Sequence, residues 1–206
     1  MAIRVANNQS LTAITALPSS ITGGAMTLIS TQTASDSATI SFTSGIDSTY
    51  KEYVFKFYDI HPESEGASGG DADFQFNLSV DTGSNYNVTK TTTSWYAGQF
   101  ESGSGYEDID YEGAYDLAQG TGFQFLGTDL GADNDQSSAG TLILYNPSNT
   151  TFVKHFMSDY VRALSSDGTF RDFVAGYGNT TSAVDAIQFK MASGNFNGVI
   201  KMYGVS

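Results

Sequence analysis

The chain has 206 residues, which suits one large β domain, or a smaller one with an arm, and is enough to bury a substantial core. Its formal net charge is −13 at pH 7, and a field of that sign repels the phosphate backbone of nucleic acids, so nucleic-acid binding is not expected. Cysteine is absent and no apolar run is long enough for a membrane helix, so disulfides, thiolate metal sites and membrane insertion are not expected either.

The first 24 residues carry apolar side chains at irregular spacing among Asn, Ser and Thr, and Pro18 interrupts them. This spacing forms no continuous face. Two interpretations stay open: a short edge strand with a loop, or an extended arm over residues 1–24 that docks on a neighbouring subunit, followed by a single domain over residues 25–206. The assembly interface of such an arm is Ile3, Val5, Leu11, Ile14 and Leu17.

After two short strands predicted at residues 26–30 and 38–43, the densest aromatic run of the chain spans residues 50–62. Side chains alternate across a strand, and aromatic residues favour that pleated setting. The two faces are Tyr53, Phe55 and Phe57 on one side, and Val54, Lys56 and Tyr58 on the other. We expect a central strand that ends at Pro62. Because its second face is also partly apolar, we expect a neighbouring subunit to cover that face.

Residues 73–80 predict a strand whose inward residues are Phe74, Phe76, Leu78 and Val80. The turn at residues 81–84 predicts a hairpin into a return strand that starts near Tyr86. Residues 63–71 and 127–140 have the composition of loops, and residues 98–113 predict a long excursion at one end of the sheet.

Further strands are predicted at residues 115–119, 123–126, 141–145, 152–160, 170–177, 183–191 and 199–205, with a turn at Asp167-Gly168. About ten short strands, no convincing helix and several long connections favour an all-β fold. We therefore predict a jelly-roll-like β-sandwich with an extended N-terminal arm.

Four stretches carry a resemblance to a known family: residues 48–62, 78–86, 140–148 and 183–205. They include Leu-Ser-Val-Asp-Thr-Gly-Ser-Asn-Tyr, Gly-Thr-Leu-Ile-Leu-Tyr-Asn-Pro-Ser and Ala-Val-Asp-Ala-Ile-Gln-Phe. In their order and spacing, over roughly residues 25–206, they resemble a poorly characterised family of virion proteins of tailed bacteriophages, common in phages of marine bacteria.

The resemblance implies a non-enzymatic structural protein on the outside of the particle, as a tail-fibre or tail component or a capsid decoration protein. The implied partners are further copies of the chain, with a trimer expected, and other virion proteins. The implied location is the virion, assembled in the host cytoplasm. The family brings no catalytic residues and no cofactor.

Two groups of residues carry side chains that can bind metal ions. Asp129, Asp133 and Asp135 supply hard oxygen ligands in a flexible loop, as calcium prefers, but their spacing does not match the EF-hand, so a solvated turn is the favoured interpretation. His61 and His155 have no cysteine or clustered histidine beside them, so no zinc site is expected.

The acidic stretch around residue 107 invites a glycosidase hypothesis, because glycoside hydrolysis uses two carboxylates. Its carboxylates are Glu101, Glu107, Asp108, Asp110 and Glu112. A solvated acidic face is the favoured interpretation, and no serine-nucleophile or phosphate-loop motif accompanies it, so we expect no enzyme.

Aromatic residues near those acids suggest an alternative function, a glycan-binding module that attaches the phage to host surface glycans. Rings stack on sugar faces, while carboxylates and amides bind hydroxyl groups. The candidate residues are Trp95, Tyr96, Tyr106 and Tyr111. Packing in the core or at a subunit interface is the competing explanation, because Tyr and Trp are also favoured at interfaces.

Overall fold

The computed structural model describes residues 25–64, 72–103 and 105–206, with the backbone alone for residues 105–108. Across these ranges the chain forms thirteen strands and one short 3-10 helix, η2 (Gly113–Tyr115). The predicted all-β class is confirmed, and the strands outnumber the ten or so expected. No helix in the described ranges is long and apolar enough to cross a membrane. The predicted arm residues Ile3, Val5, Leu11, Ile14 and Leu17 lie outside the described residues.

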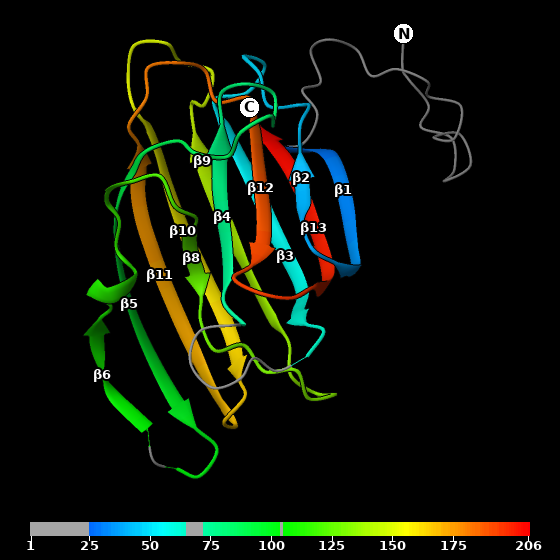
Figure 1. Cartoon of the computed structure of the whole chain (residues 1–206), viewed down its shortest axis with the longest axis vertical. Helices are drawn as coiled ribbons and strands as arrows, with labels where there is room; N and C mark the ends of the chain where they lie inside the picture. Colours follow the sequence, from blue (N-terminus) through cyan, green and yellow to red (C-terminus); the bar gives the residue numbers. More distant parts are fainter. Residues whose placement is uncertain (1–24, 65–71, 104) are drawn as a thin grey trace, which may run out of the picture.

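Two antiparallel sheets of unequal size form a β-sandwich (Figure 1). The large sheet runs in the order β1 (Met26–Ser37), β13 (Phe196–Val205), β3 (Glu52–Pro62), β9 (Ser138–Tyr145), β10 (Lys154–Leu164), β11 (Gly168–Gly178), β5 (Lys90–Phe100) and β6 (Gly105–Tyr111), and β7 (Ala118–Gly120) also pairs with β5. The small sheet runs in the order β2 (Ile40–Phe42), β12 (Ala186–Met191), β4 (Phe74–Ser79) and β8 (Gln124–Gly127).

Each strand of the small sheet is preceded and followed in the chain by a strand of the large sheet. The chain therefore crosses between the layers at both ends of β2, β4, β8 and β12. Several of these crossings run through long loops, such as residues 80–89 and 128–137, although only two residues join β1 to β2. The predicted hairpin after residues 73–80 is wrong because of such a crossing. The turn forms, with the Ser84 amide donating to the Asp81 carbonyl at 3.2 Å, but β4 and β5 belong to different sheets.

The aromatic run at residues 50–62 becomes β3, which lies between β13 and β9 in the large sheet. Phe55 and Phe57 are buried in the core, whereas Tyr58 is 39% exposed, so the predicted alternation is confirmed. Asp167-Gly168 forms the predicted turn, which joins β10 and β11 in an eleven-pair hairpin ladder.

Aromatic rings fill the space between the sheets. Phe74 of β4 stacks on Phe189 of β12, with ring centroids 5.9 Å apart and an interplanar angle of 14°. Phe57 of the large sheet meets both rings edge-on, at 5.3 and 5.2 Å. Such contacts stabilise the core beyond the buried area alone. The core rings are Phe42, Tyr53, Phe55, Phe57, Phe74, Phe76, Phe156, Tyr160, Phe189 and Phe196.

Three sequence predictions are wrong in detail. β1 continues through the polar residues 31–37, because that segment pairs with β13. All six residues of β4 are buried, while Val80, predicted to face the core, is 38% exposed. The polar side of β4 is covered by later segments, since the Asn77 amide donates to the carbonyls of Tyr86 and Thr121. Finally, residues 98–113 are not an excursion, because β5 and β6 pair across them.

Candidate functional site

The large sheet has one face turned away from the small sheet, here called the outer face, and it carries exposed apolar side chains. Buried and exposed residues alternate along β10, and its outward residues Met157 and Val161 are 54% and 44% exposed. Tyr58 of β3 lies on the same face. Solvated sheet faces normally carry polar side chains, and contiguous apolar patches mark contact sites. The outer face is therefore a candidate contact surface.

Two shallow hollows lie on the outer face, with volumes of about 450 and 510 Å³. The first lies over the small residues Ala139 and Gly140, and the second over Ala175 and Gly176. Larger neighbours surround each of these residues, so the surface is uneven in a way that side chains of another molecule can fill.

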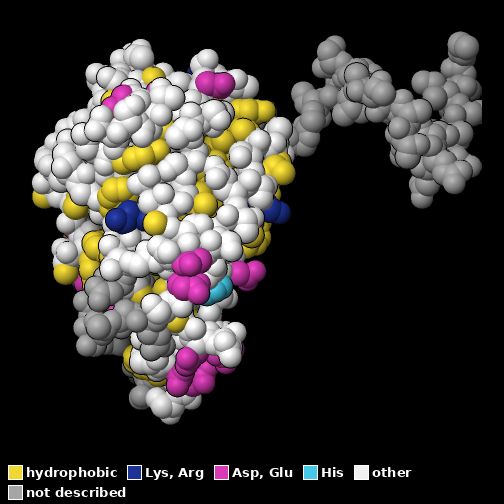
Figure 2. Space-filling view, turned by 45° about the vertical axis from the view of Figure 1, so that its right-hand side comes forward, with side chains coloured by type: hydrophobic (Ala, Val, Ile, Leu, Met, Phe, Trp, Pro, Cys, Tyr) yellow, Lys and Arg dark blue, Asp and Glu magenta, His cyan; other side chains and the backbone are white. Residues whose placement is uncertain are grey.

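Positive charge also gathers on the outer face. Five of the eight described Lys and Arg side chains are not buried, and three of those five lie here. They are Lys56, Arg171 and Lys201. The ammonium group of Lys201 lies 5.3 Å from the Tyr58 ring, and Arg171 forms an exposed ion pair with Asp159. The side that shows the small sheet is different, since acidic side chains gather over its lower part (Figure 2).

Two of the four predicted glycan-binding aromatics lie on the outer face, at its β5–β6 end. Trp95 stacks on Phe173 of β11, with centroids 5.6 Å apart and planes 16° from parallel. Trp95 is also the register partner of Tyr111, which is 67% exposed. The Arg171 guanidinium lies 4.6 Å from the Phe173 ring. Trp95, Phe173 and Tyr111 are here called the aromatic strip, which lies at the β11–β5–β6 edge of the sheet.

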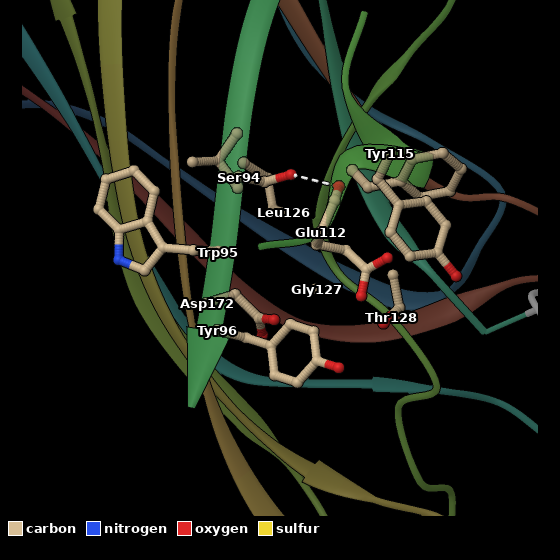
Figure 3. Close-up of a pocket in the computed structure, with 11 residues that line it drawn as sticks. Ser94, Trp95, Tyr96, Glu112, Tyr115, Leu126, Gly127, Thr128 and Asp172 are labelled. Carbon is tan, nitrogen blue, oxygen red and sulfur yellow. Dashed lines mark hydrogen bonds between the residues drawn. The ribbon is translucent and has the colours of Figure 1, made fainter. Parts of the chain in front are cut away.

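Tyr96 points to the opposite side of β5 from Trp95, as expected for adjacent strand residues (Figure 3). The side chain of Tyr106 lies outside the described residues. The predicted four-residue platform is therefore not one surface, because its described members occupy both faces of β5.

Tyr96 instead lines a cleft between β5, η2, the segment after β8 and the β10–β11 hairpin. The cleft has a volume of about 260 Å³. A smaller cavity of about 20 Å³, room for one water molecule, shares the lining residues Tyr96, Glu112, Tyr115 and Thr128 with it. The principal side chains of the cleft are Tyr96, Glu112, Tyr115, Thr128, Arg162 and Phe170.

A buried ion pair forms one wall of the cleft. Arg162 is 4% exposed, and its Nε and Nη2 atoms donate to the two Asp172 carboxylate oxygens at 2.7 and 3.3 Å. Its Nη1 atom donates to the Thr128 carbonyl. Burial raises the pKa of Asp172, and the Arg162 guanidinium opposes that shift. The two-pronged contact holds the pair in its charged form.

Glu112 and Asp129 bring to the cleft carboxylates that form no ion pair among the described residues. Burial raises the pKa of Glu112, while Arg162 lowers it and Asp172 raises it further. Its backbone carbonyl accepts a hydrogen bond from Ser94 Oγ at 3.0 Å, but no described residue donates to its carboxylate. Burial also raises the pKa of Tyr115, so the phenol stays protonated and able to donate at neutral pH.

The remaining acidic candidates do not assemble into a site. Asp129 and Asp133 use their backbone amides, which donate to the side chains of Asp73 and Gln136. Asp135 is exposed. Across residues 25–64, 72–103 and 105–206, no three acidic or imidazole side chains converge as a metal site requires.

The two histidines make different contacts. The His61 ring lies 2.9 Å from the carbonyl of Asp59, and the His155 ring packs edge-on against Tyr177. Of the carboxylates considered for glycoside hydrolysis, Glu112 enters the cleft and Glu101 is exposed. The side chains of Glu107 and Asp108 lie outside the described residues.

Comparisons with models of protein families, with curated proteins and with solved structures find no match in any of the three. Function is therefore argued from the fold, its surfaces and the sequence resemblance.

Proposed function

We propose that this chain is a non-enzymatic structural protein of a bacteriophage virion, in which copies assemble on the outside of the particle as a tail-fibre or tail component or a capsid decoration protein. The sequence resemblance suggests the virion, and the outer face suggests how the copies meet.

The exposed apolar side chains of the outer face are the observation that carries this proposal. Met157 and Val161 project from β10, and Tyr58 projects from β3, with β9 between the two strands of the same sheet. Small residues line the hollows beside them. Leaving such a patch in water is unfavourable, and covering it releases about 25 cal/mol per Å² of apolar area. A second copy covers it without any change in fold.

Charge favours a particular kind of contact between copies. The outer face gathers accessible cations, while the whole chain carries a net charge of −13. Asp159 neutralises Arg171, but Lys56 and Lys201 form no ion pair among the described residues, so two outer faces brought together repel, whereas the outer face of one copy attracts an acidic surface of another. Contacts between different patches are heterologous, and they form closed rings such as trimers when the rotation between copies closes.

The test is the oligomeric state of a variant with a charged outer face. Met157→Glu together with Val161→Glu should convert an oligomer, measured by multi-angle light scattering, into a monomer with an unchanged circular dichroism spectrum. The matched control is Phe152→Glu, because Phe152 is 69% exposed but lies outside the strands. The control should assemble like the parent.

A monomeric parent chain, or an outer-face variant that assembles as well as the parent, contradicts the proposal. Antibody labelling of purified phage particles tests the virion location separately. Labelled particles support the location, and particles without label contradict it.

Glycan recognition is the second candidate, favoured by the aromatic strip of Trp95, Phe173 and Tyr111. The strip is partly exposed, as a platform for sugar faces needs to be, and Tyr111 is its most exposed ring. Trp95→Ala should lower host-cell adsorption or glycan-array signal. Equal adsorption by the variant and the parent counts against this strip.

A further inference from the structure

We propose that the cleft binds one neutral, hydroxyl-rich ring of the kind found at the end of a glycan chain. The cleft lies on the opposite side of β5 from Trp95, so this inference is independent of the outer face and of the aromatic strip (Figure 3). Its volume of about 260 Å³ is just below the roughly 300 to 1,000 Å³ of sites for drug-sized ligands, which suits one sugar ring.

Arg162 supplies fixed hydrogen-bond donors to the cleft. A guanidinium group has five N–H bonds, and the described partners Asp172 and Thr128 accept three of them. The same bonds hold the side chain in place, and each of its three nitrogen atoms makes one of them. The second N–H bonds of Nη1 and Nη2 have no described acceptor, and a ligand hydroxyl oxygen can accept them.

Glu112 supplies the matching acceptor. Its carboxylate lines the cleft and receives no hydrogen bond from any described residue. The phenol of Tyr115 and the hydroxyl groups of Ser165 and Ser166 lie around the same space. A sugar hydroxyl both donates and accepts, so one ring can use the Glu112 acceptor and the Arg162 donors together.

Aromatic rings supply the apolar wall that a sugar ring also needs. Tyr96 and Phe100 pack against Phe170, with centroid separations of 5.3 and 5.7 Å, and all three line the cleft. These rings can bury the C–H face of a sugar, while the polar groups of the cleft take its hydroxyls.

Charge selects against other ligands. The carboxylates of Glu112, Asp129 and Asp172 outnumber the single cation Arg162, so phosphates and acidic sugars are repelled. The same carboxylates attract cations, but the Arg162 guanidinium already supplies a fixed positive charge among them, 4.9 Å from the Phe170 ring, and propylamine therefore enters the experiment as the competing ligand.

The experiment titrates the full chain with methyl glucoside, methyl galactoside and methyl mannoside, followed by saturation-transfer NMR and calorimetry. At least one hexoside should bind saturably. Glu112→Gln keeps the shape of the side chain and should weaken binding about tenfold or more, since a hydrogen bond to a charged group is lost. Binding should also weaken as the pH falls through the raised pKa of Glu112, because the protonated acid accepts hydrogen bonds less well.

Two residues of β5 give a matched comparison. Tyr96→Ala should abolish binding, while Gln99→Ala, at an exposed position on the other side of the strand, should leave it unchanged. Loss of binding with Trp95→Ala alone overturns the cleft and favours the aromatic strip instead. Absence of saturable hexoside binding, preferential binding of methyl glucuronide or propylamine, or full affinity in Glu112→Gln also overturns the inference. Should Tyr96→Ala fail to fold, Glu112→Gln decides the outcome.

Discussion

Lys90 makes the stability of this protein depend on pH in the neutral to alkaline range. Its side chain is fully buried, and its ammonium group donates to Asn77 Oδ1 and, at 2.9 Å, to the Val88 carbonyl. Neither acceptor is charged. The described residues form two ion pairs, Arg162–Asp172 and Arg171–Asp159, and Lys90 takes part in neither. Burial without a counter-charge lowers the pKa of Lys90 to about 7.

The sign of the effect follows from which state holds the proton. In the unfolded chain the lysine titrates at its ordinary value of 10.5, so between pH 7 and 9 the unfolded state keeps a proton that the folded state releases. Stability therefore rises with pH in this window. Linkage with these two values gives an increase in the free energy of unfolding of about 2 kcal/mol between pH 7 and 9. For a chain of this size that corresponds to a rise in Tm of roughly 4 to 8 °C.

Calorimetric or urea unfolding at pH 7, 8 and 9 measures the slope directly. Lys90→Met should remove most of it, leaving a smaller contribution from Lys154, whose pKa burial also lowers. Lys51→Met is the control, because Lys51 is exposed and the variant should keep the slope of the parent. A parent whose stability is flat or falls over this range, or a Lys90→Met variant with the parent's slope, refutes the reasoning.

Two further predictions concern packing around the cleft. Gly98→Ala should lower the free energy of unfolding by about 1 to 3 kcal/mol in urea titrations, because the new Cβ would lie 2.5 Å from the Phe170 ring. Unchanged stability would mean that Phe170 moves aside freely. Arg162→Met should cost about 3 to 5 kcal/mol, since it leaves Asp172 buried without its partner. Adding Asp172→Leu should recover much of that loss, and a double variant no more stable than Arg162→Met contradicts the ion-pair argument.

Much of the fold could be predicted because alternation is a local signal. β3, β10 and β11 overlap predicted strands, since aromatic residues such as Phe55, Phe156 and Phe170 recur at their inward positions, and Asp167-Gly168 fixes the turn between the last two. The predicted strand at residues 26–30 is shorter than β1, because the polar residues 31–37 at the sheet edge show no apolar alternation. The sheet to which each strand belongs could not be predicted, since the crossings depend on which layers pack together.

Glycines mislead in a different way. They suggest turns, yet Gly98 and Gly140 lie inside strands of this protein. A Cβ on Gly140 would approach the Tyr160 ring to 2.7 Å, and one on Gly98 would meet Phe170. In both places glycine makes room for a ring from the next strand, a relation between residues about 20 to 70 positions apart that no local pattern contains.

Some features of the candidate site are visible in the local sequence, and others depend on residues far apart in the chain. Grouping Trp95 with Tyr96 by closeness in the chain placed them on one surface, but the two-residue period of a strand had already put them on opposite faces. The pairing of Arg162 with Asp172 could also have been predicted from the sequence. Both are charged residues at inward positions of strands that flank a predicted turn, and a buried charge needs a partner.

The position of Glu112 in the cleft could not be predicted from the sequence, because it depends on η2 and on the pairing of β6 with β5. The outer face and the cleft lie on different sides of β5. Copies can therefore assemble through the outer face while the cleft stays open to a ligand.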